Sequence, residues 1–188
     1  VPRFFEKIQK TLLNNLTGFK KQMFNWALQK GYKYHKAARE GKLTLWRRFS
    51  YKVAKKLILK KLHAKMGLRR LRHFGCGGAP FARHILLFFE ALDLCIVEGY
   101  GLTESSPIIA MNSKDGYKPG TVGKVLPGMK VKIAPDGELL AKGSSVMQGY
   151  YCMPGRTAKV LKDGYLHTGD IASIDKDGYL RIIDRKKE

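Results

Sequence analysis

The chain has 188 residues, of which 44% are hydrophobic, so it is long enough to bury a core as one domain or two small ones. No stretch approaches the roughly 18 apolar residues of a membrane-spanning helix, and the first twenty residues are too polar for a signal peptide. The net charge of +21 is concentrated, because residues 1–73 hold 21 Lys and Arg against 2 Asp and Glu, whereas residues 74–188 hold 15 against 13. This asymmetry indicates an acidic partner for the first third, or an acidic part of a longer protein.

The three cysteines, Cys76, Cys95 and Cys152, lie far apart and share no Cys-x-x-Cys spacing. Such thiols are typically buried and reduced, which predicts a cytoplasmic protein. The five histidines show no metal-ligand spacing. Because the chain begins at Val1 rather than Met and stops inside a charged run, we expect it to be a piece of something longer.

Apolar residues recur at helical spacing through the basic first third. The pattern predicts helices over 3–16, over 19–39 with Gly31 as an interruption, and from Leu45 to Met66, where Gly67 is a natural stop. The apolar face of the third helix comprises Trp46, Phe49, Val53, Leu57 and Leu62. We expect this face to pack on a core while the Lys and Arg side chains stay solvated. Direct contact with anionic lipid is the alternative.

After Gly67 the pattern changes to alternating strands and helices. Residues Leu71 to Cys76 predict a strand, Pro80 to Leu92 a helix, and Leu94 to Val97 a second strand. A strand–helix–strand unit predicts parallel pairing, with ligands at the carboxyl ends of the strands. Two glycine-containing loops, at 75–80 and 99–104, fall at those ends.

The remainder of the chain is predicted to be rich in β-structure. Val131–Ala134 and Glu138–Ala141 flank a Pro-Asp-Gly turn and predict a hairpin. A second hairpin is predicted from Ile171–Ile174 and Tyr179–Ile183. Between the two hairpins, residues 156–161 predict a short helix.

Two segments carry candidate chemistry. The segment Gly99-Tyr100-Gly101-Leu102-Thr103-Glu104 offers an aromatic face that covers a flat base, and a Thr-Glu pair that supplies a phosphate donor and a magnesium ligand. Asp170 follows a Thr-Gly turn at the start of the second hairpin, where a carboxylate can accept both hydroxyls of a ribose. For each segment alone, a plain structural turn is the alternative.

Six segments form an ordered series. They are GGAP (77–80), GYGLTE (99–104), KPGTVGKVLPG (118–128), GELLAKGSSVMQGYY (137–151), YLHTGD (165–170) and DRKKE (184–188). In order and spacing they resemble the adenylate-forming acyl-CoA synthetases. The opening VPRFFEKI, the basic helical segment, HTGD and DRKKE resemble the long-chain fatty-acid–CoA ligases among them.

The resemblance covers essentially the whole chain and implies a partial adenylate-forming fold of the α/β class, a central to C-terminal fragment of the family's large N-terminal domain. Three segments are expected. A basic helical segment over 1–67 precedes an α/β nucleotide-pocket segment over 68–128, which holds part of a parallel sheet layer. A β-rich, distorted barrel-like subdomain over 129–188 ends at the hinge to an absent C-terminal domain.

The resemblance also implies roles for the matching residues in nucleotide binding. The loop that would line the adenine pocket comprises Gly77, Gly78, Ala79 and Pro80. Tyr100 would stack on adenine, and the flanking Gly99 and Gly101 would lie near the acyl carboxylate.

In the same resemblance, Thr103 would hold the α-phosphate and Glu104 would coordinate Mg²⁺. Asp170 would bind the ribose hydroxyls, with Arg185 closing on the same ribose. The pivot of the hinge would lie at one of two residues, Lys186 or Lys187.

The implied activity is activation of a long-chain fatty acid by ATP, giving an acyl-adenylate that coenzyme A then converts to the thioester and AMP. The implied partners are the fatty acid, ATP with Mg²⁺, and coenzyme A, with peripheral contact to an anionic membrane through residues 1–73. The family's phosphate loop and its C-terminal adenylation lysine are absent from this sequence. We therefore expect the chain alone to be inactive in adenylation while keeping part of the nucleotide pocket.

Two alternatives remain at this point. The first is an adenylate-forming ligase for another carboxylic acid, because no residue of an acyl tunnel can be identified. The second is a basic module that binds an anionic membrane or nucleic acid through residues 1–73, and its binding would fall steeply with salt.

Overall fold

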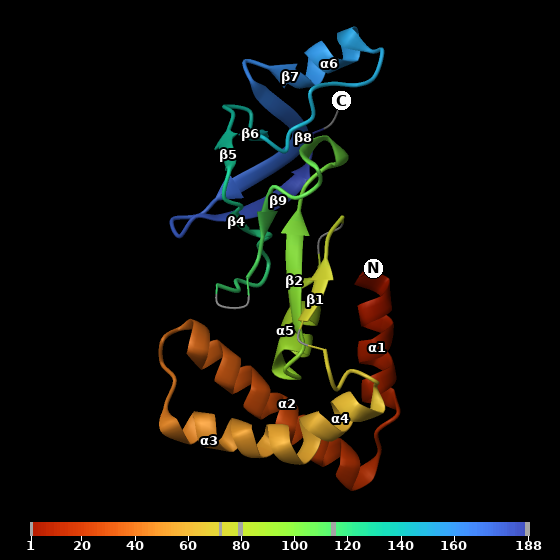
Figure 1. The fold of residues 1–188 in the computed structure, drawn as a ribbon. Coiled ribbons are helices and arrows are strands. Elements are labelled where there is room, and N and C mark those ends of the chain that lie inside the picture. Colours follow the sequence, from red (N-terminus) through yellow and green to blue (C-terminus); the bar gives the residue numbers. More distant parts are fainter. Residues whose placement is uncertain (1, 72, 79–80, 114–115, 187–188) are drawn as a thin grey trace. The chain divides into compact units, whose positions relative to one another are not determined.

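A computed structural model describes residues 2–71, 73–78, 81–113 and 116–186 (Figure 1). The chain divides into two compact units. Unit 1 comprises Val1–Phe74 and Phe81–Ile96, and unit 2 comprises Gly75–Pro80 and Val97–Glu188. None of the helices in the described ranges is both long and apolar enough to cross a bilayer. The three-segment division expected from the sequence stays a prediction.

Unit 1 is helical. Its helices are α1 (Pro2–Asn14), α2 (Gly18–Arg39), α3 (Leu45–Ala54), the π-helical stretch η1 (Lys55–Leu59), α4 (Lys60–Lys65) and α5 (Arg83–Ala91). The predicted helices are confirmed, and Gly67, with φ of +71°, follows the end of α4 as expected for a helix stop. The core of unit 1 includes Phe5, which makes edge-to-face contacts with Phe74, Phe81 and Phe89.

The prediction that Gly31 interrupts its helix is wrong. Gly31 lies buried inside the continuous helix α2, against the last residue of α5. A Cβ atom at this position would lie 1.9 Å from the carbonyl oxygen of Ala91. The glycine is therefore required for the close approach of two helices rather than for a turn.

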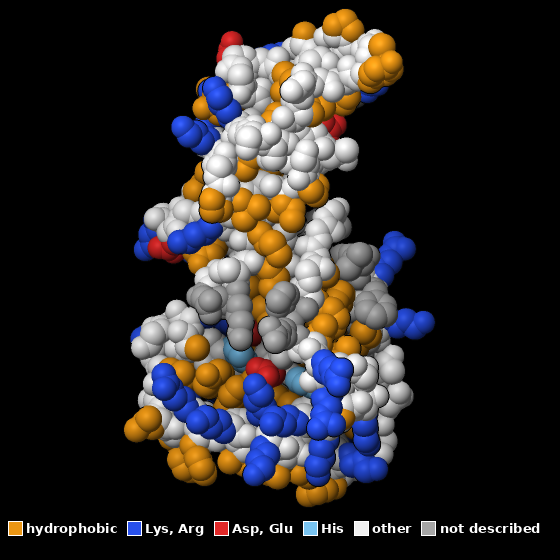
Figure 2. Space-filling view, viewed as in Figure 1, with side chains coloured by type: hydrophobic (Ala, Val, Ile, Leu, Met, Phe, Trp, Pro, Cys, Tyr) orange, Lys and Arg blue, Asp and Glu red, His pale blue; other side chains and the backbone are white. Residues whose placement is uncertain are grey.

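The predicted core face of the third helix is also wrong. Trp46 is 71% exposed and Phe49 is 59% exposed, whereas Tyr51, Ala54 and Leu59 are buried. Tyr51 and Ala54 are three residues apart, whereas Ala54 and Leu59 are five apart. The π-helical stretch η1 holds one extra residue in its turn, which changes the residues that face the core after it. Figure 2 shows Lys and Arg side chains gathered over the helices of unit 1, with hydrophobic side chains exposed among them.

A polar network joins α2 and α3 to the end of α5 inside unit 1. Arg39 donates to both carboxylate oxygens of Glu90, and the Tyr51 hydroxyl donates to Asp93 Oδ1 over 2.9 Å. His35 Nε2 lies 3.2 Å from the same hydroxyl oxygen. Burial lowers the pKa of His35 to about 4, so the imidazole is neutral at pH 7.

The described strands form one nine-stranded sheet. They are β1 (His73–Cys76), β2 (Cys95–Tyr100), β3 (Ala110–Met111), β4 (Gly123–Val125), β5 (Met129–Ile133), β6 (Glu138–Gly143), β7 (Leu161–Lys162), β8 (Tyr165–Ile174) and β9 (Tyr179–Arg185). The order is β1-β2-β3-β4-β9-β8-β6-β5, with β7 paired to β8. Strands β1 and β2 point the same way in Figure 1, and the strand pairs from β2 onward are antiparallel. The predicted α/β class is confirmed.

Both predicted hairpins of unit 2 are confirmed, as β5–β6 and β8–β9, and the predicted short helix is α6 (Pro154–Val160). A cluster of buried hydrophobic residues stabilises the sheet that contains these hairpins. It consists of Ala110, Leu139, Ala172 and Leu180. Tyr100 packs against this cluster, so its ring is fixed at the end of β2.

Candidate functional site

The described part of unit 2 brings Tyr100 and Asp170 together, although 70 positions separate them in the sequence. The phenol of Tyr100 donates a hydrogen bond to Asp170 Oδ2 over 2.5 Å. Burial, followed by this bond to Asp170, raises the pKa of Tyr100 far above its ordinary value of 10.0. Tyr100 therefore remains a neutral donor at physiological pH, and GYGLTE and YLHTGD meet at this contact.

Gly99 and Tyr100 lie in strand β2, not in the loop that the sequence predicted. The prediction ended the strand at Val97 because Gly99 resembles a turn residue. In the structure Gly99 and Tyr100 pair with Met111 and Ala110 of β3. The strand pairing aims the Tyr100 ring.

Asp170 lies within β8 rather than at the start of the hairpin, so its predicted place after a turn is corrected. Gly169 before it has φ of +71°, and β8 has three residues between His167 and Ile171 where the paired β6 has only Leu139, which identifies a bulge in β8. Thr168 Oγ1 accepts the Asp170 N–H over 3.2 Å and donates to the carbonyl of Leu139 over 2.8 Å. The bulge and the threonine together fix the backbone of Asp170, whose side chain is 11% exposed.

Arg185 lies opposite Asp170, as its Cα partner in the β8–β9 ladder. Its Nε atom is 3.6 Å from Asp170 Oδ1. The two residues that the sequence assigned to one ribose are therefore neighbours. The Arg185 side chain is 80% exposed and able to contact a ligand from solvent.

Thr103 and Glu104 lie in the short 3₁₀ turn η2 (Thr103–Ser105), which begins three residues after the last residue of β2. Glu104 Oε1 accepts a hydrogen bond from the hydroxyl of Tyr150 over 2.8 Å, and its carbonyl accepts the N–H of Met147 over 2.8 Å. The bond to Glu104 raises the pKa of Tyr150. The GSSVMQGYY segment thus orients the candidate metal ligand.

Ser105 is a buried site-forming residue that the sequence analysis missed. Its Oγ accepts the N–H of Leu102 over 2.9 Å and lies 2.9 Å from the carbonyl oxygens of Leu102 and Pro107. These contacts close the turn that presents Thr103 and Glu104. A serine followed by Ser-Pro was the only signal available in the sequence.

Two of the candidate glycines, Gly77 and Gly101, lie close to backbone atoms of other segments. A Cβ on Gly77 would lie 3.2 Å from the carbonyl oxygen of Gly99, so the two glycine segments approach each other. A Cβ on Gly101 would lie 1.6 Å from the carbonyl oxygen of Pro107, and Gly78 has φ of +84°. The predicted Ala79 and Pro80 lie outside the described residues.

At the C-terminal end of β9, the N–H of Lys186 donates to the carbonyl of Gly169 over 2.8 Å. Its Nζ contacts Asp136 Oδ2 at 2.6 Å and Glu138 Oε2 at 2.9 Å. The other predicted pivot residue, Lys187, lies outside the described residues.

The described ranges contain no group of three or more His, Cys, Asp or Glu side chains that could hold a metal ion. A magnesium–nucleotide complex requires only one or two protein carboxylates, because the phosphates and water supply the other ligands. Glu104, oriented by Tyr150, fits that requirement.

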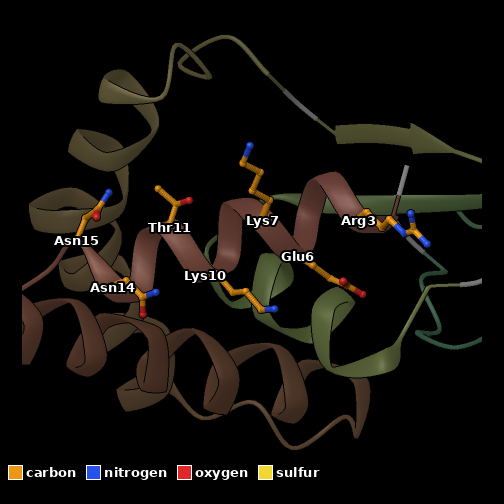
Figure 3. Close-up of a pocket in the computed structure, with 7 residues that line it drawn as sticks. All are labelled: Arg3, Glu6, Lys7, Lys10, Thr11, Asn14 and Asn15. Atoms are coloured by element: carbon orange, nitrogen blue, oxygen red, sulfur yellow. The ribbon is translucent and has the colours of Figure 1, made fainter.

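A surface hollow of about 390 Å³ lies elsewhere, along α1 (Figure 3). Its lining residues come from one helix and the residue after it: Arg3, Glu6, Lys7, Lys10, Thr11, Asn14 and Asn15. The hollow contains none of the predicted nucleotide-binding residues.

Comparison with known proteins gives relatives over the whole chain. A long-chain-fatty-acid–CoA ligase from Mycobacterium bovis, FadD15, is 38% identical over 189 residues, which are 100% of this chain and 31% of the relative. The long-chain-fatty-acid–CoA ligase ACSBG2 from Rattus norvegicus is 34% identical over 89% of this chain and 26% of its own length. The chain therefore spans between a quarter and a third of these relatives.

Two solved structures have a fold similar to part of this chain. The amide bond synthetase McbA (K483A mutant) from Marinactinospora thermotolerans is 32% identical, with a TM-score of 0.58 over 64% of this chain and 28% of that one. The o-succinylbenzoate coenzyme A synthetase MenE from Bacillus subtilis, in complex with ATP and magnesium, is 28% identical, with a TM-score of 0.56 over 61% of this chain and 26% of that one. The family model described as AMP-binding enzyme matches residues 1–151, and the chain belongs to this family.

Proposed function

We propose that the chain is part of an ATP-dependent ligase that activates a long-chain fatty acid as its acyl-adenylate and transfers it to coenzyme A. The observation that carries this proposal is the contact of Tyr100 with Asp170, because it joins an aromatic face suited to adenine with a carboxylate suited to ribose hydroxyls. The carboxylate has about four lone-pair positions, so the phenol leaves room for a ribose.

The proposed roles of the other candidate residues follow from the positions of adenine and ribose at this contact. Arg185 adds a cation beside the ribose, and Thr103 and Glu104 extend from the same strand end toward the phosphates. When bound, Mg²⁺ neutralises phosphate charge at Glu104. In the proposed reaction, a carboxylate oxygen attacks the α-phosphorus and pyrophosphate leaves; the thiol sulfur of coenzyme A then attacks the acyl carbon and AMP leaves. Positioning and charge neutralisation supply most of the catalysis.

The acyl substrate is proposed from the relatives. FadD15 and ACSBG2 are both named long-chain-fatty-acid–CoA ligases and are similar to 89–100% of this chain. The solved relatives McbA and MenE carry names that refer to other reactions, so an adenylate-forming ligase for a different carboxylic acid is the second candidate.

A calorimetric titration tests the proposal, using AMP and non-hydrolysable acyl-adenylate analogues with short and long chains. We expect salt-tolerant binding that Asp170→Asn abolishes and that Asp163→Asn, an exposed turn position, leaves unchanged. Tighter binding of the long-chain analogue would support the fatty acid. Equal binding by the chain and its Asp170→Asn variant would refute the nucleotide site.

For the basic helices, we propose peripheral contact with an anionic membrane from the cytoplasm. The specific observation is the exposed face of α3, where Trp46 stacks on Phe49 with 6.0 Å between ring centroids. Arg47, Arg48 and Lys52 are exposed on the same helix. Exposed aromatic rings beside cations are typical of segments that lie in a lipid interface.

Vesicle co-sedimentation tests this contact. We expect binding to vesicles containing phosphatidylglycerol but not to phosphatidylcholine alone, and a strong loss in the Trp46→Ser, Phe49→Ser double variant. Ile183→Ser, which removes a 61%-exposed hydrophobic side chain from unit 2, is the matched control. If the double variant bound as well as the unchanged chain, the aromatic face would not be the contact surface.

A further inference from the structure

Glu138, at the start of β6, is 5% exposed, and none of the roles proposed above involves it. Its two carboxylate oxygens contact different segments of unit 2. Oε1 accepts the N–H of Gly169 over 2.9 Å, and Oε2 accepts from Nζ of Lys186 over 2.9 Å. Glu138 therefore connects the bulge that presents Asp170 to the end of β9.

The contacts among Glu138, Gly169 and Lys186 form a closed ring. The carbonyl of Gly169 accepts the N–H of Lys186 over 2.8 Å, so Gly169 is bound on one side by Glu138 and on the other by Lys186. Lys186 also contacts Asp136 in the β5–β6 turn, over 2.6 Å. Moving Lys186 requires the loss of both ion pairs and of one of the two backbone contacts that hold Gly169.

The pKa values of Glu138 and Lys186 are shifted so that both side chains of the ring stay charged. Burial would raise the pKa of Glu138, but Lys186, the Gly169 N–H and His167, whose Nδ1 is 3.3 Å away, outweigh burial and lower it. Asp136, followed by Glu138, raises the pKa of Lys186. Both carboxylates and the ammonium are therefore charged across the neutral range.

We propose that Glu138 and Asp136 form a latch for Lys186, and that the closed latch holds Gly169 so that Asp170 is positioned for a ribose. Glu138 and Lys186 are positioning residues, since they act on Asp170 through the Gly169 backbone. The inference rests on the proposed function for the role of Asp170. It adds that loss of the Lys186 contacts frees Gly169 and weakens nucleotide binding, so the latch and the ribose site are coupled.

Amide hydrogen exchange of Gly169 tests the latch without any ligand. The variants are Lys186→Met and Glu138→Gln. The matched control is Lys118→Met, because Lys118 bridges Asp175 and Asp177 at the other hairpin turn with a similar exposure of 39% against 43%. We expect about threefold faster exchange at Gly169 in both latch variants, the size expected of a partly exposed ion pair, and no change in the control. Unchanged exchange at Gly169 would overturn the proposal.

AMP affinity, measured by calorimetry on the same variants, tests the coupling. We expect about threefold weaker binding in Lys186→Met and Glu138→Gln, and unchanged binding in Lys118→Met. Faster exchange with unchanged affinity would overturn the positioning role. If the unchanged chain bound no AMP, the proposed function would fail, and the exchange measurement alone would decide whether the latch exists.

Discussion

Gly31→Ala is predicted to destabilise unit 1, although alanine is the better helix former. In an isolated helix this change would stabilise by about 1 kcal/mol. Here the new Cβ would lie 1.9 Å from the carbonyl oxygen and 2.7 Å from the carbonyl carbon of Ala91. These are backbone atoms, so no side-chain rotation relieves the overlap and α5 must move.

The size of the stability loss in Gly31→Ala follows from two opposing free-energy contributions. Overpacking in a core costs up to about 3 kcal/mol, and this overlap belongs at the upper end because Phe88 and Phe89 fix α5 in the core. Subtracting the helix propensity leaves a net loss of about 2 kcal/mol. For a unit of about 90 residues, this loss lowers Tm by roughly 8–16 °C.

Tryptophan fluorescence during thermal unfolding measures this effect selectively, because Trp26 and Trp46 are the chain's two tryptophans and both belong to unit 1. Gly155→Ala is the control, since a Cβ there meets nothing within 4 Å in the short helix α6. It should leave the fluorescence transition unchanged. A rise in Tm for Gly31→Ala would refute the close helix contact.

Three further outcomes are expected. Burial lowers the pKa of His35 to about 4, so between pH 4 and 6.5 the unfolded chain binds more protons than the folded chain. The free energy of unfolding therefore has its full value above pH 6.5 and is about 2 kcal/mol smaller at pH 5. Urea unfolding of His35→Gln should show a smaller decrease over this pH range. Ser105→Ala should destabilise unit 2 by about 1–3 kcal/mol in urea unfolding followed by tyrosine circular dichroism, whereas the exposed Ser144→Ala should not. Tyr150→Phe should weaken ATP binding about threefold with Mg²⁺ present and leave AMP binding unchanged, and an equal loss for AMP in calorimetry would contradict a role through Glu104.

The sequence by itself determined the family, the order of helices and hairpins, and the candidate residues Tyr100, Asp170 and Arg185. Each of these depends on local patterns: helical periodicity, Gly-containing turns, and motifs of four to fifteen residues. Local backbone preferences act over the same short range, so the predicted helices and both hairpins are confirmed. The bounds of β2 and β8 were the exception, since Gly99 and Gly169 resemble turn residues but lie in paired strands.

The tertiary structure alone decided which atoms meet. The buried face of the third helix depends on η1, which shifts the phase by one residue, and Gly31 is explained only by the backbone of Ala91, 60 positions away. The bond from Tyr100 to Asp170 and the latch at Glu138 likewise join distant segments. A single sequence does not encode such contacts as local patterns, because strand register and helix packing are fixed by the simultaneous burial of many side chains.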